Sequence, residues 1–168
     1  MFVVRENKRI PGIHFIQFSG KPTDEELQVY LDSERERLSA GRGERNVTVL
    51  HLTEAWTAIQ RKNMQELEKE VIARSWPMQL ALAMVIPNRL VRGGITAYFW
   101  IAPAPYATKM VAAATDAYDF VASQLEEAGR AVPSRERYVA EAEAEWSGRV
   151  ATPGVGWVPL GNKNAGTG

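Results

Sequence analysis

The chain has 168 residues and a mass of 18.7 kDa, which is enough for one ordinary domain with its own core and too little for two. Apolar residues make up 45% of the chain and charged residues 24%, which excludes wholesale disorder. Twenty basic residues balance twenty acidic ones, so no overall electrostatic field draws the chain toward nucleic acid or an anionic membrane. The absence of cysteine excludes disulfides, thiolate zinc sites and cysteine nucleophiles.

The first residues carry Arg5 and Glu6 and lack the apolar core of a secretory signal. The two longest apolar stretches, residues 80–87 and 95–103, are shorter than the roughly 20 residues that span a bilayer. We therefore expect a cytoplasmic protein that does not insert into a membrane.

Alternating apolar residues predict two strands over residues 2–6 and 13–19, joined by a turn at Pro11-Gly12 into a hairpin. Residues 23–26 then have the Thr-x-x-Glu form of a capping box, in which the two side chains satisfy backbone donors at a helix start. A first helix is therefore expected to run to about residue 39.

Residues 47–52 are a short β-branched run and predict a strand buried in the middle of a sheet. A second capping box at residues 57–60 predicts a second helix, which ends before Pro77. Residues 80–86 fit a helix or a strand by periodicity, and prolines bracket them at strand length, so we predict a strand.

Residues 88–102 alternate as in a strand and also share a helix face, and we favour a helix. An edge strand is predicted over 108–112, and a helix capped by Thr115 is predicted to end at Gly129. A last helix is predicted over 135–146.

The element order predicts an α/β fold with a mixed sheet of about five strands and about four helices, followed by an extra C-terminal helix and a flexible tail. We expect an α/β domain over 1–130 and a helical extension over 131–147. Glycine, proline and asparagine prevail in residues 148–168, which we expect to be the flexible tail.

Three segments carry a resemblance to a known family. Residues 13–20 lead into the capping box at 23–26, residues 47–52 run into Thr53-Glu54, and residues 85–87 lead into Arg92-Gly93-Gly94. With the element order, these segments resemble the STAS domain, and more closely the SpoIIAA-like or STAS-like proteins of bacteria. The resemblance implies a regulatory or binding module that docks protein partners rather than an enzyme.

In the anti-sigma-factor antagonists of that fold, a serine after the central strand is phosphorylated at the start of the second helix. No serine stands there in this chain, and Thr53 and Thr57 are the hydroxyls that could replace it. Phosphorylation of Thr57 would place charge near a helix N-terminus and alter a docking surface. The competing interpretation, which we favour, is that Thr57 is only an N-cap.

Neither His14 nor His51 has a partner at metal-ligand spacing, so we predict no metal site, and nothing indicates a cofactor. His51 ends the central strand at the carboxyl edge of the sheet, where α/β proteins tend to bind ligands. A hydrogen-bonded structural histidine is nevertheless the more frequent case.

Four cations and several aromatic residues complete the candidate site. Arg61 with its neighbour Lys62, and Arg89 with Arg92, could lie at the edge that carries His51 and Trp56, and would suit an anion. Ordinary surface is the commoner role of such cations. Trp100 belongs to an aromatic group that packs in the core or forms an interface with a partner or a second copy.

We therefore expect a non-catalytic STAS-like regulatory module that docks a protein partner in bacterial signalling, with a homodimer as a further expectation and no nucleic-acid partner. The expected binding residues are His51, Thr53, Glu54, Trp56, Thr57, Arg61, Arg89, Arg92 and Trp100. The alternative is a module that binds an anionic small molecule or a lipid in a pocket between the second helix and residues 88–102. An enzyme would have only His51, Thr53 and Glu54, which form no recognisable catalytic arrangement.

Overall fold

The structure is a computed structural model that describes residues 1–39, 45–54, 57, 60, 62–63, 66, 69–70, 79–101 and 103–160. No helix in these ranges is long and apolar enough to cross a membrane. The elements, in chain order, are β1 (Val3–Asn7), β2 (Ile13–Ser19), α1 (Asp24–Ser39), β3 (Asn46–Leu52), β4 (Gln79–Val85), α3 (Arg89–Ile101), β5 (Ala107–Val111), the 3-10 helix η1 (Ala114–Ala117), α4 (Tyr118–Glu127), α5 (Arg135–Glu143), β6 (Ser147–Thr152) and β7 (Gly156–Pro159).

The described strands form one mixed sheet in the order β5-β4-β3-β2-β1-β6-β7. Strands β2 to β5 are parallel, whereas β1 is antiparallel to β2, and β6 is antiparallel to both β1 and β7. The predicted α/β class and mixed sheet are confirmed. The helix over 88–102 and the edge strand over 108–112 are also found, as α3 and β5.

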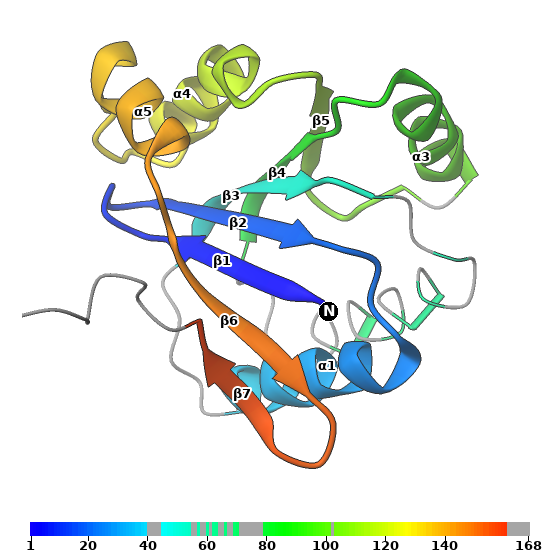
Figure 1. The fold of residues 1–168 in the computed structure, drawn as a ribbon. Helices are drawn as coiled ribbons and strands as arrows, with labels where there is room; N and C mark the ends of the chain where they lie inside the picture. Colours follow the sequence, from blue (N-terminus) through cyan, green and yellow to red (C-terminus); the bar gives the residue numbers. More distant parts are fainter. Residues whose placement is uncertain are drawn as a thin grey trace, which may run out of the picture.

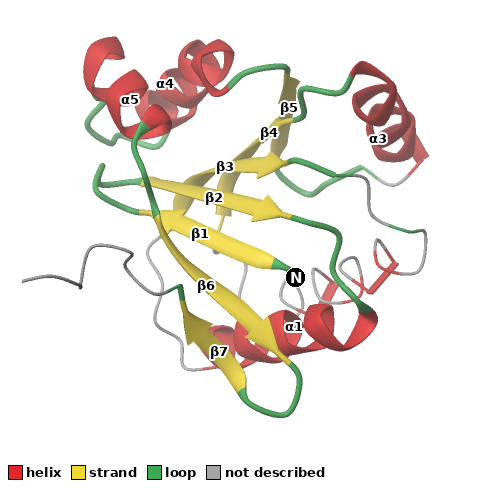
Figure 2. Ribbon diagram, in the orientation of Figure 1, coloured by secondary structure: helices red, strands yellow, loops and turns green. Residues whose placement is uncertain are grey.

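Helices cover both faces of the sheet (Figures 1 and 2). Helices α4 and α5 pack on one face, where Phe15, Val49, Ala83 and Leu125 belong to one buried cluster. Helices α1 and α3 pack on the other face, where Phe18 and other buried residues form a second cluster. Because β2, β3 and β4 contribute alternate residues to both clusters, they are the strands around which the two layers are built.

The first predicted capping box is formed at the start of α1. The Glu26 backbone N–H donates to Thr23 Oγ1 at 3.1 Å, and the Thr23 backbone N–H donates to Glu26 Oε2 at 2.9 Å. Glu26 Oε1 also accepts from the Phe2 backbone N–H at 3.1 Å, so the same carboxylate ties the start of α1 to the residue before β1.

Thr115 does not cap the helix before Gly129, as the sequence had suggested. It lies inside η1, and α4 begins afterwards at Tyr118 with no side-chain cap. Asp116, the third residue of η1, supports the start of η1 instead, because its carboxylate accepts from the Ala113 backbone N–H at 3.3 Å. Asp116 lies one residue further than Thr115 from the start of η1. This third position is where the acid of a capping box accepts from the backbone N–H of the N-cap residue.

The prediction of a flexible tail from residue 148 was wrong for residues 148–159, because β6 and β7 extend the sheet beyond the expected five strands. The glycines that suggested flexibility serve the turn between the two strands, where Gly154 and Gly156 have φ of 76° and 93°. Ala151 is buried and Trp157 packs against the α1 side of the sheet. Residues 161–168 lie outside the described part.

Candidate functional site

The parallel strands end together at one edge of the sheet, and the loop after β3 leaves from that edge. Thr53, Glu54 and Thr57 are all exposed there. The loop is nevertheless held in place at its start, because the Thr53 backbone N–H and Oγ1 both donate to the Phe18 carbonyl, at 3.4 and 3.1 Å. Trp56 and Arg61, which were expected beside these residues, lie outside the described residues.

Thr57 acts as the N-cap that the sequence predicted. Its Oγ1 accepts from the Gln60 backbone N–H at 3.2 Å, and its own N–H donates to Gln60 Oε1 at 3.0 Å. Gln60 is only 2% exposed, and its Nε2 donates to the Pro22 carbonyl at 2.8 Å and to Asp24 Oδ1 at 3.5 Å. One buried amide thus fixes the start of the second helix against the start of α1.

His51 lies on the face that α4 and α5 cover, like Val47 and Val49, which are four and two residues before it. Its ring meets the edge of Trp146 at 5.1 Å between centroids and an angle of 88°. Burial lowers the pKa of His51 to about 4, and its Nε2 is buried without a hydrogen-bond partner in the described structure. The hydrogen-bonded histidine that was expected is therefore replaced by a neutral ring packed on an aromatic one.

The two arginines of α3 do not join His51, because α3 packs on the opposite face of the sheet. Arg92 donates from one terminal nitrogen to the Ile86 carbonyl at 2.7 Å and to the Pro87 carbonyl at 3.4 Å, which ties α3 to the end of β4. Arg89 is exposed at the first position of α3. Trp100 lies in α3, and its side chain is outside the described part.

The pocket that was expected between the second helix and residues 88–102 would be lined largely by residues that the structure does not describe. No group of three His, Asp or Glu side chains that could hold a metal ion occurs among the residues that it does describe. The described part of the candidate site thus consists of the exposed residues Thr53, Glu54 and Thr57, with the buried Gln60 hydrogen-bonded to Thr57.

A second polar cluster, which the sequence analysis missed, lies on the α1 side of the sheet. Glu6 Oε1 lies 3.0 Å from His14 Nε2, and Glu6 Oε2 lies 3.2 Å from a terminal nitrogen of Arg149. Burial alone would raise the pKa of Glu6, but the His14 hydrogen bond and the charges of Arg149, His14 and Lys8 lower it to about 2. The Arg149 guanidinium in turn covers the Trp157 ring at 4.3 Å. The alternation of side chains along β1 and β2 places Glu6 and His14 on one face of the sheet. Nothing in the neighbouring sequence indicates that Arg149 would join them.

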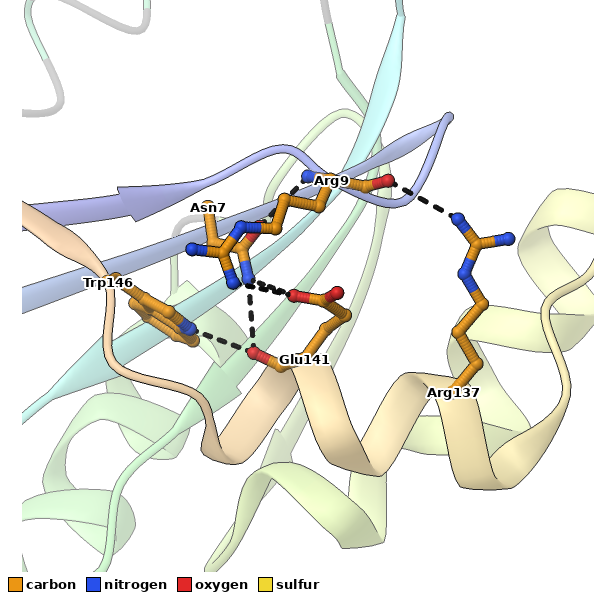
Figure 3. Close-up of polar contacts among 5 residues, drawn as sticks. All are labelled: Asn7, Arg9, Arg137, Glu141 and Trp146. Atoms are coloured by element: carbon orange, nitrogen blue, oxygen red, sulfur yellow. Dashed lines mark hydrogen bonds and ion pairs between the residues drawn. The ribbon is translucent and has the colours of Figure 1, made fainter.

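A third cluster fastens α5 to the start of the chain (Figure 3). Asn7 Nδ2 donates to the Glu141 carbonyl at 3.1 Å and to Glu141 Oε2 at 2.9 Å, and Arg9 pairs with the same carboxylate at 3.2 Å. Arg137 reaches the Arg9 carbonyl at 3.4 Å, and Trp146 Nε1 donates to the Glu141 carbonyl at 2.8 Å. These contacts hold α5 in place against the end of β1 and the residues that follow it.

The arrangement of these elements is that of the SpoIIAA-like fold. The fold is similar to a crystal structure from Shewanella loihica PV-4, described as an uncharacterized protein of the DUF3478 family with a SpoIIAA-like fold. The TM-score is 0.53 at 13% sequence identity, and the match covers 72% of this chain and 95% of the other. No family model matches the sequence, and no curated protein matches it. The likeness confirms the SpoIIAA-like fold that the sequence predicted.

Proposed function

We propose that this protein is a STAS-like regulatory module without catalytic activity, which docks a protein partner in bacterial signalling. The partner would contact the loop after β3 and the start of the following helix. The observation that carries the proposal is that Thr53, Glu54 and Thr57 are exposed beside a helix start that the buried Gln60 ties to the residues before α1. A surface ordered before binding loses less conformational entropy when a partner docks.

Thr57 also offers a means of regulating the docking. A phosphate on Thr57 would add negative charge at the Oγ1 that now accepts from the Gln60 N–H, and the adjacent helix N-terminus would favour the new charge. Thr53 is the second candidate for phosphorylation, and its hydroxyl would have to leave the Phe18 carbonyl. In this proposal, either modification changes the affinity for the partner.

The test begins with the identification of a partner that co-purifies with the tagged chain from a bacterial host, followed by a binding titration with the purified partner. Glu54→Lys reverses a charge in the loop, and we expect about tenfold weaker binding. The matched control is Glu126→Lys, which makes the same charge change at an exposed position of α4, on the other side of the sheet, and should change the affinity less than about twofold.

Equal affinities for the wild-type chain and Glu54→Lys would place the docking surface elsewhere. Native mass spectrometry of gently purified protein tests the rival function at the same time. A retained anionic small molecule or lipid would favour the ligand-binding module, and Arg89→Ala would then be the variant to examine, because Arg89 is exposed at the start of α3. An added phosphate mass would identify the modified threonine after digestion.

A further inference from the structure

The C-terminal hairpin of β6 and β7 lies along the outer edge of β1 (Figure 1). The β1–β6 register runs from Val3 opposite Val150 to Glu6 opposite Ser147. Without the hairpin, β1 would be an edge strand with a row of unpaired backbone groups, which is a template for another strand. The hairpin therefore occupies a strand-binding surface of the same chain.

The β1 edge is specific for this hairpin on both faces of the sheet. On the α1 side, Arg149 pairs with Glu6 at 3.2 Å and covers Trp157, whose ring meets Tyr30 edge-on at 6.3 Å between centroids. On the other side, Gly148 lies opposite Arg5, and a Cβ there would come within 2.5 Å of Leu160 Cδ1, just after β7, and within 3.1 Å of Arg5 Cγ. The hairpin thus fits this edge closely, with a glycine opposite Arg5 and an arginine next to it.

The hairpin is also one of the least buried parts of the sheet. Its residues are mostly exposed or half-buried, and Ala151 is its only fully buried member, whereas residues 81–85 of β4 are all buried. Arg149 Nε and Trp157 Nε1 are buried without a hydrogen-bond partner in the described structure, and this opposes closure. Such units open locally while the rest of the fold persists.

An open β1 edge has few good occupants. If two copies paired through β1 in the antiparallel register that uses all five residues, Arg5 would lie directly opposite its own counterpart. Like charges at such positions are destabilising. The segment known to fit the edge is the β6–β7 hairpin, which leaves the hairpin of a second copy as the favoured occupant of an open edge.

We propose that two copies of this chain form a dimer by exchanging their β6–β7 hairpins, so that each hairpin lies on β1 of the other copy. Trp146 stays with α5 through its bond to the Glu141 carbonyl, and the path of the chain changes after it. The connection is already extended from Ala144, with φ −66° and ψ 159°. Because exchange recreates every contact of the closed hairpin, it is a low-cost route to a dimer. The proposal does not depend on the docking loop.

Disulfide trapping tests the exchange, and the native chain contains no cysteine that would interfere. Two single variants, Val3→Cys and Val150→Cys, are labelled with different isotopes, refolded together at high concentration and oxidised. Positions 3 and 150 are cross-strand partners, so a disulfide between the two variants forms efficiently only when the hairpin of one copy lies on β1 of the other. Mass spectrometry after digestion compares the amount of this mixed disulfide with the amounts of the two symmetric disulfides, one joining position 3 of two copies and the other joining position 150 of two copies.

We expect the mixed disulfide to exceed each symmetric product by about fivefold, rather than the statistical twofold, and to increase with the concentration at refolding. A control mixture of Val3→Cys with Val132→Cys, at an exposed position in the α4–α5 connection, should give no such excess. No excess over this control at any concentration would overturn the proposal. The double variant Val3→Cys/Val150→Cys checks that these two positions are paired in the β1–β6 register. If this double variant formed no disulfide at all, the proposal would also be overturned.

The rate of exchange gives a second test that a folding defect would not imitate. Trp157→Ala removes the same contacts from the closed monomer and from the exchanged dimer. It should therefore speed the appearance of the mixed disulfide by about tenfold and change the final dimer fraction less than about twofold. A large fall in the dimer fraction with an unchanged rate would contradict exchange.

Discussion

At the scale of single residues, the burial of His51 makes the free energy of unfolding depend on pH. Its pKa is lowered by burial from 6.5 to about 4, so the folded chain holds the ring neutral at pH values where the unfolded chain protonates it. The unfolded state then binds more protons, and the free energy of unfolding falls as the pH drops from about 6.5 toward 4. Above pH 6.5 this contribution to stability is complete.

The variant His51→Leu should lose this pH dependence. Between pH 7 and pH 4.5 we expect the free energy of unfolding of the wild-type chain to fall by about 2 kcal/mol more than that of His51→Leu. Urea unfolding at the two pH values measures the fall in the free energy of unfolding for each chain. Because each fall is measured within one chain, the loss of packing against Trp146 in His51→Leu cancels from the comparison. Parallel falls in both chains would mean that the ring is hydrated in the folded state.

At the scale of elements, Gln60 joins two helix starts that the sequence treats as separate motifs. Its side chain accepts from Thr57, donates to the Pro22 carbonyl and is almost fully buried. We expect Gln60→Ala to lower the free energy of unfolding by about 2 kcal/mol, since buried partners lose their hydrogen bonds. Amide exchange should increase at the starts of both α1 and the second helix.

Gln28→Ala is the matched control, because Gln28 is exposed on α1 and its amide donates only to Asp32 within the same helix. This change should cost less than about 0.5 kcal/mol and leave exchange at the second helix unaltered. If Gln60→Ala affected only its own helix, the bond to Pro22 would not couple the two starts.

The elements that the sequence predicted are those specified by neighbouring residues. The capping boxes at Thr23 and Thr57 and the β1–β2 hairpin each depend on side chains a few residues apart. The hairpin of β6 and β7 was missed because its partner strand, β1, lies at the other end of the chain. Turn residues mark such a hairpin as readily as they mark a flexible segment.

The candidate site was predictable only in part, for the same reason. Alternation places His51 on the same face as Val47 and Val49, but the sequence does not say which helices cover that face. The structure covers it with α4 and α5, so His51 is separated from Arg92 on α3. Thr57 was placed correctly because its role is set by Gln60, three residues along the chain.

At the scale of the whole molecule, two helical layers share one sheet. Leu27 of α1 and Leu125 of α4 are fully buried in different clusters, one on each face. Since β2, β3 and β4 contribute side chains to both clusters, loss of either layer leaves an apolar sheet face open to water. The layers should therefore unfold together rather than one after the other.

Two substitutions of the same kind test this coupling. Leu27→Ala and Leu125→Ala should each lower the free energy of unfolding by about 3 kcal/mol, because each opens a cavity in a fully buried position. Hydrogen exchange of α1 and of α4 should be accelerated equally in both variants, since each amide would exchange through the same global opening. If each substitution accelerated exchange only in its own helix, the layers would be separate cooperative units.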